Sequence, residues 1–462
     1  MHMNQLNVVL AYIKTGLLLF LLILVGCSAE EESHQTLVEG TITVADSVDD
    51  TGNYQGIELL IFQKDSANAN ADTLLWAETD TSGHFSGTAV FESDGFYPVM
   101  VTRNNRVLGR DQLILADSDT LHISAQLPAF SRTLQLESYQ HKALSTFNRL
   151  NRQFRRVGSY MRAGKITRDS LPSMMKKWSG IYWDVYEKYG DTFAGRMSAV
   201  KSLDISGNAD YEKSRRKIAR LAEDEKARSI AIEYGKDLIS RKKGIKAGIH
   251  FLDSLKQVGT SSQKRQISRA KITLLYDSSR IDAAKKELET FKANYADTKE
   301  IKKWANNIGY DLENLAPGDS IPSFSFSTVD GAKLNRNTLV GNPYILEIST
   351  LANELYKDQY SRSQIINNLF QPRGLRFITV PLDASQVTVN SFFEARGGMP
   401  WKVATVSSVD RDQILSKFNI QQIPTRFLVD SEGNIVKKLV TNEYQNIIPY
   451  IQQTLTPKEE NS

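Results

Sequence analysis

The stretch FNIQQIPTRFLVDSEGNIV, residues 418–436, decides the fold of the last third of the chain. Four segments upstream belong with it. They are PGDSIPSF (317–324), VDGAKL (329–334), LVGNPYILEI (339–348) and the apolar-rich run LRFITVPL (375–382). Strands interleaved with helices in this order indicate a layered α/β sandwich for residues 316–462.

These segments resemble the corresponding parts of the peroxiredoxin and membrane-anchored thioredoxin group of proteins. The resemblance implies a thioredoxin-like α/β sandwich, with a first central strand within 339–348. A second, parallel strand at Leu375–Leu382 would end at Asp383. The resemblance also implies a cis Ile423–Pro424 peptide bond, followed by a strand and a hairpin that turns at Ser431–Asn434.

Where this group of proteins carries its reactive thiols, the chain has other residues. Family members place a Cys-x-x-Cys turn after the first central strand, at the N-terminus of a helix whose dipole lowers the thiol pKa. The resemblance puts Asn353 and Tyr356 at the two cysteine positions, and Thr350 where peroxiredoxins have the threonine of Thr-x-x-Cys. Asn and Tyr form neither a thiolate nor a disulfide. Residues 316–462 also contain no histidine, which excludes a Ser/His nucleophile within them.

The single cysteine, Cys27, stands at the end of a hydrophobic leader. The apolar run Leu17–Val25 is shorter than the roughly 20 residues that a membrane-spanning helix needs, and is typical of a secretory signal. Its end, Leu24-Val25-Gly26-Cys27, resembles the lipobox of bacterial lipoproteins. The resemblance implies that residues 1–26 are removed and that Cys27 becomes an acylated N-terminus followed by a tether at 27–35. The alternative is an ordinary cleaved leader with an incidental cysteine.

The lipobox resemblance also implies a location in the bacterial cell envelope. Two or three acyl chains, such as palmitate, anchor a protein stably, whereas one chain is marginal. Ser28 follows the cysteine where family sorting rules place Asp for inner-membrane retention, so the outer membrane is favoured. Whether the protein faces the periplasm or the cell surface stays open.

Charge is segregated along the chain. Residues 1–130 contain 5 Lys and Arg against 17 Asp and Glu, residues 131–315 contain 38 against 22, and residues 316–462 contain 14 against 14. The boundaries suggested by hydrophobic pattern fall at nearly the same places, which predicts a multidomain chain. The expected domains are a small β-sandwich at 36–128, a helical domain at 131–313 and the α/β sandwich at 316–462.

Alternating apolar residues and Asp/Gly/Asn turns predict the β-sandwich, which we interpret as a spacer or docking module. Apolar residues three and four apart predict a middle helical bundle or array of about seven helices. The segments are 136–161, 171–189, 209–240, 245–257, 264–276, 281–295 and 299–312. The basic charge of this region favours solvated helix faces or an acidic or anionic partner. An envelope location argues against nucleic acid.

The residues suggest no metal, nucleotide or other cofactor. The six histidines (2, 34, 84, 122, 141 and 250) show no ligand-like spacing, and no phosphate-binding glycine motif is present. We therefore expect no catalytic residues of these kinds.

Peptide binding is the main functional hypothesis. In this fold the active-site turn and the cis-proline loop border a groove that holds an extended polypeptide through backbone hydrogen bonds, and strand addition needs no cysteine. We expect a redox-inactive, lipid-anchored protein that binds a peptide or protein partner. Two alternatives stay open: a thiol-disulfide oxidoreductase or peroxidase, and a structural role in an envelope assembly through the basic helices. The candidate groove residues are Thr350, Asn353, Tyr356, Ile423, Pro424 and Thr425.

Overall fold

The computed structural model describes residues 33–63, 72–207 and 210–456. The chain divides into two compact units, Met1–Ser214 and Arg215–Ser462. The expected signal peptide 1–26 and the expected lipid site Cys27 lie outside the described residues. Within the described ranges, no helix has the length and apolar character needed to cross a membrane.

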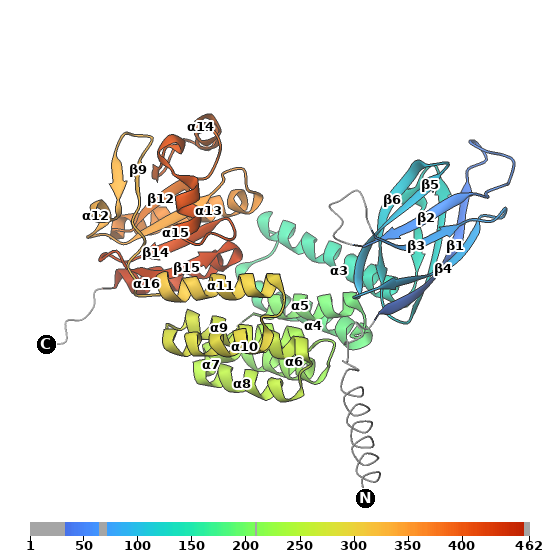
Figure 1. The fold of residues 1–462 in the computed structure, drawn as a ribbon, viewed down its shortest axis with the longest axis horizontal. Helices are drawn as coiled ribbons and strands as arrows, with labels where there is room; N and C mark the ends of the chain where they lie inside the picture. The colour runs from blue at the N-terminus through green and yellow to red at the C-terminus, as the bar shows by residue number, and fades with distance from the viewer. Residues whose placement is uncertain (1–32, 64–71, 208–209, 457–462) are drawn as a thin grey trace, which may run out of the picture. The chain divides into compact units, whose positions relative to one another are not determined.

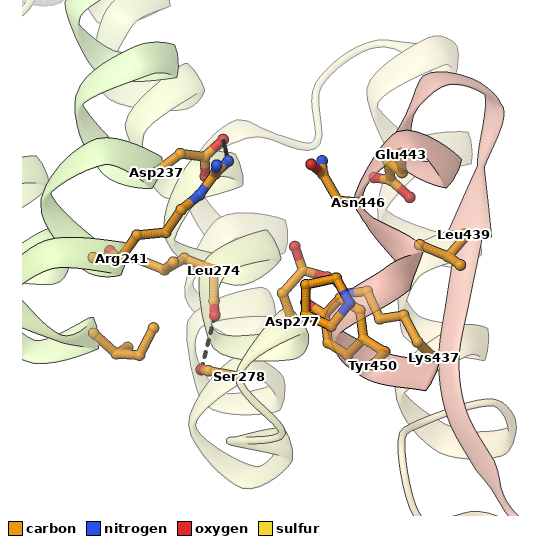
Figure 2. A pocket seen from close by; sticks show the side chains of 13 residues that line it. Asp237, Arg241, Leu274, Asp277, Ser278, Lys437, Leu439, Glu443, Asn446 and Tyr450 are labelled. Atoms are coloured by element: carbon orange, nitrogen blue, oxygen red, sulfur yellow. Dashed lines mark hydrogen bonds and ion pairs between the residues drawn. The ribbon is translucent and has the colours of Figure 1, made fainter. Parts of the chain in front are cut away.

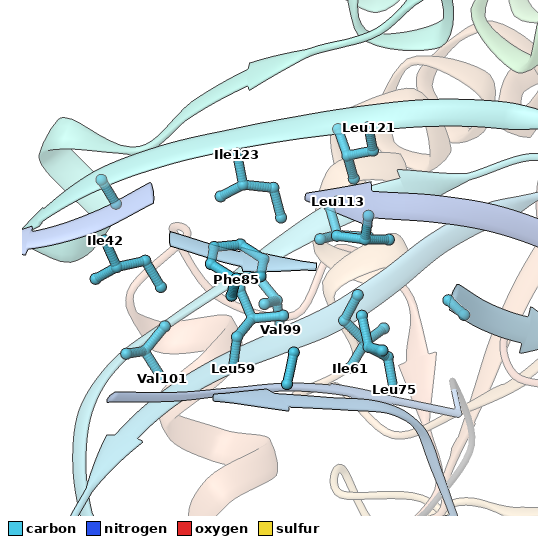
Figure 3. Packing of buried hydrophobic residues seen from close by; sticks show 14 of the residues in the cluster. Ile42, Leu59, Ile61, Leu75, Phe85, Val99, Val101, Leu113, Leu121 and Ile123 are labelled. Atoms are coloured by element: carbon cyan, nitrogen blue, oxygen red, sulfur yellow. The ribbon is translucent and has the colours of Figure 1, made fainter. Parts of the chain in front are cut away.

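The first unit begins with two four-stranded sheets (Figure 1). The two sheets share one hydrophobic core. One sheet has the strand order β4-β1-β7-β8 and the other β3-β2-β5-β6. Every second residue of β7 is buried, so its sheet has one apolar face. Figure 3 shows side chains from both sheets meeting in this core, among them Ile42 and Ile123 from one sheet and Leu59 and Val101 from the other. The strands are β1 (His34–Val44), β2 (Ile57–Phe62), β3 (Thr73–Glu78), β4 (His84–Phe91), β5 (Gly95–Arg103), β6 (Arg106–Leu115), β7 (Asp119–Leu127) and β8 (Gln135–Glu137).

Helices α3 (Tyr139–Arg162), α4 (Leu171–Tyr189) and α5 (Phe193–Ser206) follow in the first unit, with the short α2 (Phe130–Thr133) and η1 (Arg168–Ser170). His141, in the first turn of α3, is 7% exposed, and its Nε2 accepts a hydrogen bond from the Ile114 amide of β6 at 3.2 Å. Burial lowers the pKa of His141 to about 4. The neutral ring therefore links α3 to the sheet.

The next helices along the chain, up to residue 314, are α6 (Tyr211–Glu223), α7 (Arg228–Lys243), α8 (Ile245–Val258), α9 (Ser261–Asp277), α10 (Ile281–Tyr295) and α11 (Lys299–Asn314). The described residues between 139 and 314 thus contain nine α-helices where about seven were predicted. The predicted helix 209–240 is two helices, and α5 was missed. Helix α5 buries small and polar residues such as Ser198, Ala199 and Ser202, so it lacks the apolar stripe by which the others were recognised. The boundary between the units falls inside the expected helical domain, at Ser214–Arg215.

The second unit ends in a five-stranded mixed sheet of order β13-β12-β11-β14-β15. Strands β11, β12 and β13 are parallel, and β14 and β15 are antiparallel to their neighbours. The predicted cis bond at Ile423–Pro424 and the predicted hairpin between β14 and β15 are both confirmed. The strands of this sheet are β11 (Tyr344–Ser349), β12 (Arg376–Pro381), β13 (Lys402–Val403), β14 (Thr425–Val429) and β15 (Ile435–Val440). Strands β9 (Ser325–Ser327) and β10 (Lys333–Asn335) form a separate two-stranded sheet.

Both faces of this sheet are covered. Leu346 and Phe427 belong to a core on one face, whereas their sequence neighbours Ile345 and Leu428 belong to a core on the other. This is why β11 and β14 are buried at every position rather than at every second one. The helices that accompany the sheet are α12 (Arg336–Leu339), α13 (Glu354–Phe370), α14 (Gln386–Glu394), α15 (Arg411–Lys417) and α16 (Ile447–Leu455), with the short turns η2 (Gln371–Arg373), η3 (Val406–Ser408) and η4 (Thr441–Asn446).

Within the second unit, a buried ion pair joins α11 to the sheet. The Lys438 ammonium of β15 is 2.8 Å from both carboxylate oxygens of Asp311. Asn419 donates to Asp311 Oδ1 at 2.8 Å and to the Asn307 carbonyl at 2.9 Å. Burial lowers the pKa of Lys438, which Asp311 partly offsets. The helices and the sheet of this unit are therefore fixed to each other by specific polar contacts.

Candidate functional site

Two polar side chains hold the turn after β11. The Leu351 amide donates to both carboxylate oxygens of Asp383, at 3.2 and 3.0 Å. Asn353 is the N-cap of α13, and its Oδ1 accepts a hydrogen bond from the Tyr356 amide at 3.0 Å. An N-cap of this kind stabilises a helix by about 1 kcal/mol relative to alanine. The position that aligns with the first family cysteine therefore stabilises the helix start.

The cis-proline loop lies at the same end of the sheet as this turn. Ile348, near the end of β11, pairs with Thr425, the first residue of β14. The turn and the loop continue outward from these two paired positions. Ala352 and Glu354 of the turn and Gln421 and Gln422 of the loop are exposed, whereas Thr350, Asn353 and Ile423 are half-buried.

The other three predicted groove residues, Tyr356, Pro424 and Thr425, are buried. Tyr356 is 1% exposed, and its ring lies 5.7 Å from that of Phe392. Thr425 is also 1% exposed and donates to the Gln422 carbonyl at 2.6 Å. The prediction that these side chains line an open groove is wrong, because the first turn of α13 and the start of β14 direct them into the protein.

A fully buried ion pair lies in the strands that carry the turn and the loop. Glu347 of β11 and Arg426 of β14 are directly opposite in register, and both side chains are 0% exposed. Arg426 Nε donates to Glu347 Oε2 at 2.6 Å, and Arg426 Nη1 donates to Gln359 Oε1 of α13 at 2.7 Å. Buried charges persist only when paired and hydrogen-bonded. The pair therefore fixes α13 against the sheet.

Further polar groups complete what we call the Glu347–Arg426 cluster. Thr379 of β12 donates to Glu347 Oε1 at 3.1 Å and accepts from the Trp401 indole at 2.8 Å. The Arg426 guanidinium lies 3.7 Å from the centre of the Tyr444 ring. Burial, and then the charge of Glu347, raise the pKa of Tyr356. Its phenol therefore stays protonated at neutral pH.

Sequence reasoning missed this cluster, although a signal was present. A single Glu interrupts the apolar run YILEI (344–348), and a single Arg interrupts TRFLV (425–429). Opposite charges in two strands that must both be buried indicate a pair. Register, however, decides which residues meet.

The cluster contains no thiol and no imidazole. Residues 316–462 contain neither cysteine nor histidine. Across the described residues, no group of His, Cys, Asp or Glu is arranged to hold a metal ion. The arrangement can order a binding surface, and it offers no thiol for disulfide exchange.

About a third of the chain is similar to thiol-disulfide oxidoreductases. It is 22% identical over 154 residues to thiol-disulfide oxidoreductase ResA from Bacillus subtilis, covering 33% of this chain and 84% of that protein. ResA from Bacillus anthracis is 22% identical over 149 residues, covering 32% of this chain and 83% of that protein. The C-terminal region has a thioredoxin-like fold. No family model matches the chain.

Solved structures of similar proteins cover the same share of the chain. The thioredoxin domain of a thiol-disulfide oxidoreductase from Bacteroides vulgatus is 19% identical, with a TM-score of 0.27, and covers 30% of this chain and 99% of that one. A thiol:disulfide interchange protein from Bacteroides sp. is 20% identical, with a TM-score of 0.28, and covers 32% of this chain and 95% of that one.

A separate cavity of about 430 Å³ lies between the helices and the sheet of the second unit (Figure 2). Lys437 and Asp277 form an ion pair at 2.5 Å on one wall, and Arg241 and Asp237 lie 3.8 Å apart on another. Burial raises the pKa of Asp237 and of Glu443. Each of the two cations that line this cavity pairs with a carboxylate, so its walls have no strong surplus of one sign. The Lys437–Asp277 ion pair joins α9 to β15.

Proposed function

We propose that this protein is a lipid-anchored component of a bacterial envelope whose thioredoxin-like region binds a peptide or protein partner without redox chemistry. One observation carries the proposal. The turn before α13 and the cis-proline loop are both present, yet the turn has an N-capping Asn353 and a buried Tyr356 where a dithiol would stand. The single cysteine of the chain is Cys27, far away in sequence.

The exposed part of this surface supports binding of an extended chain. Ala352 and the half-buried Thr350, Asn353 and Ile423 lie at one end of the sheet, where two loops leave neighbouring strands. The Glu347–Arg426 cluster beneath them makes the surface rigid, which reduces the entropy cost of binding. The similar oxidoreductases act on disulfides, and this chain would keep only the polypeptide-binding half of such a function.

A site-specific photo-crosslinker tests the binding surface. We expect a crosslinker at Ala352 in intact cells to give a discrete adduct, and one at Leu369, an exposed residue farther along α13, to give none. Thr350→Arg should abolish the Ala352 adduct without changing the fold. Equal adducts from both positions, or an adduct that survives Thr350→Arg, would contradict binding at this surface.

Redox activity is the alternative that the similar proteins suggest. Mature protein carrying Cys27→Ser should neither reduce insulin disulfides nor consume peroxide. Activity in either assay would overturn the redox-inactive part of the proposal. Crosslinking at Ala352 could still succeed in that case, so the two parts fail separately.

The envelope anchor is tested by labelling. Cells fed radioactive palmitate should label the wild-type protein and fail to label Cys27→Ser, which should also leave the membrane fraction. An unlabelled wild-type protein would exclude lipidation. We further infer that the two N-terminal sheets form a β-sandwich that acts as a spacer between this anchor and the rest of the chain.

A further inference from the structure

A second cavity of the same unit, about 480 Å³ in volume, is lined by α7, α9 and α11. Its volume falls within the roughly 300–1,000 Å³ that small-molecule sites occupy. Helix α9 contributes one face, with positions spaced by three and four residues so that their side chains lie together. The residues lining the cavity are Glu233 and Lys236 of α7, Ser262, Arg265, Gln266, Arg269, Ala270 and Thr273 of α9, and Trp304 of α11.

The charged groups that line this cavity leave a surplus of two positive charges, whereas those in Figure 2 leave one carboxylate in excess. Three cations line it against one carboxylate, Glu233, which already pairs with Lys236. Among the described residues, neither Arg265 nor Arg269 has a carboxylate within ion-pair distance. These two arginines are four residues apart on one helix, and two like charges at this spacing destabilise the helix. Partial burial, and then the charge of Arg265, lower the pKa of Arg269.

An aromatic side chain holds one of these guanidinium groups in place. The Arg269 guanidinium lies 4.3 Å from the centre of the Trp304 ring. The indole is itself fixed by an edge-on contact with Phe291, at 4.9 Å between ring centres. A stacked guanidinium keeps its N–H groups free for two parallel hydrogen bonds to an oxyanion, which a lysine cannot reproduce.

We propose that this cavity binds a phosphate monoester, with Arg265 and Arg269 as its main ligands. The two surplus positive charges match a group that carries about −1.5 to −2 at neutral pH, whereas a carboxylate would neutralise only one of them. Ser262 and Thr273 line the cavity on the same face of α9, one towards each end. The phosphate comes from either a free small molecule or the headgroup of phosphatidic acid, since both present the same chemistry.

Calorimetry on the full chain separates these two sources. Inorganic phosphate and glycerol 3-phosphate probe the free ligand. Vesicles of phosphatidylcholine with and without phosphatidic acid, added to protein carrying Cys27→Ser, probe the headgroup. We expect Arg265→Gln and Arg269→Gln each to weaken binding at least about tenfold, because each removes charge-assisted hydrogen bonds. Lys264→Gln removes one positive charge from α9 outside the cavity and should change affinity less than about twofold.

Absence of binding by all of these probes would overturn the proposal. So would an equal loss in Lys264→Gln and Arg269→Gln, which would indicate diffuse attraction to a basic surface. If either glutamine variant fails to fold, Arg265→Lys and Arg269→Lys replace it. These keep the charge and remove the planar fork, so unchanged affinity in them would also contradict the proposed geometry.

Discussion

Replacing Arg426 by methionine should destabilise the thioredoxin-like region strongly. The substitution removes the hydrogen bonds to Glu347 at 2.6 Å and to Gln359 at 2.7 Å, together with the stacking on Tyr444. Glu347 would remain fully buried, with Thr379 as its main donor. Removing one partner of a buried pair costs about 3–5 kcal/mol, because the other charge is left uncompensated.

The double variant Glu347→Leu with Arg426→Met is the matched control. Replacing both members of a buried pair by apolar residues is often close to neutral, so we expect the double variant to recover at least about 2 kcal/mol of the loss.

The assay must report on this region alone, because a chain of two compact units need not unfold in one step. Urea titration with pulsed hydrogen exchange, read by mass spectrometry on peptides from β11 and β14, gives the local free energy of unfolding. A loss below about 1 kcal/mol for Arg426→Met, or a double variant as unstable as the sum of the two single ones, would refute the reasoning.

Three other substitutions test separate parts of the structure. Asp311→Ala should cost about 3 kcal/mol in the β15 peptides, because Lys438 would be left buried without its carboxylate. The free energy of unfolding of the first unit should be constant above pH 6.5 and should fall by on the order of 3 kcal/mol as the pH drops toward 4. The reason is that between these pH values His141 binds a proton only when the unit unfolds. His141→Gln should remove this pH dependence in the α3 peptides. In a Cys27→Ser background, Asn353→Cys with Tyr356→Cys should form a disulfide, detected as a mass shift on alkylation, while loss of the buried ring costs about 3 kcal/mol.

A control variant or a contradicting outcome is defined for each of these changes. Asp282→Ala on α10 removes an exposed carboxylate and should alter stability by less than about 0.5 kcal/mol. If it costs as much as Asp311→Ala, charge removal in general and not the buried pair would be responsible. A first unit whose stability is flat between pH 6.5 and 4 would exclude the role of His141. Two free thiols under oxidising conditions would contradict the placement of the pair at 353 and 356.

Much of the C-terminal fold could be predicted because its signals are local. The buried strands are apolar on both faces, and the Ile-Pro step and the Asp-Ser-Glu-Gly-Asn turn are short-range features, so the cis bond and the hairpin appeared where expected. Helix α5 was missed for the opposite reason. Its buried face is made of small polar residues, and periodicity of apolar side chains cannot detect such a face.

The candidate site could be predicted only in part. The turn and the loop were located correctly. The structure brings together the strand ends from which they leave, through the pairing of Ile348 with Thr425. The prediction for Tyr356 failed because the direction of a side chain depends on how its helix sits on the sheet. The same limit hid the cavity on α9, where Arg269 meets Trp304 from a helix 35 positions farther along the chain.

The sequence by itself determined that this chain has one cysteine, Cys27, and no cysteine or histidine in residues 316–462. Only the tertiary structure decided which side chains meet and which are buried. It pairs Glu347 with Arg426, buries Tyr356 and, within the described part of the chain, places Arg265 and Arg269 in one cavity whose single carboxylate, Glu233, pairs with Lys236. Composition limits which chemistry is possible, whereas the free energy of a charge depends on neighbours that only folding brings within a few ångströms.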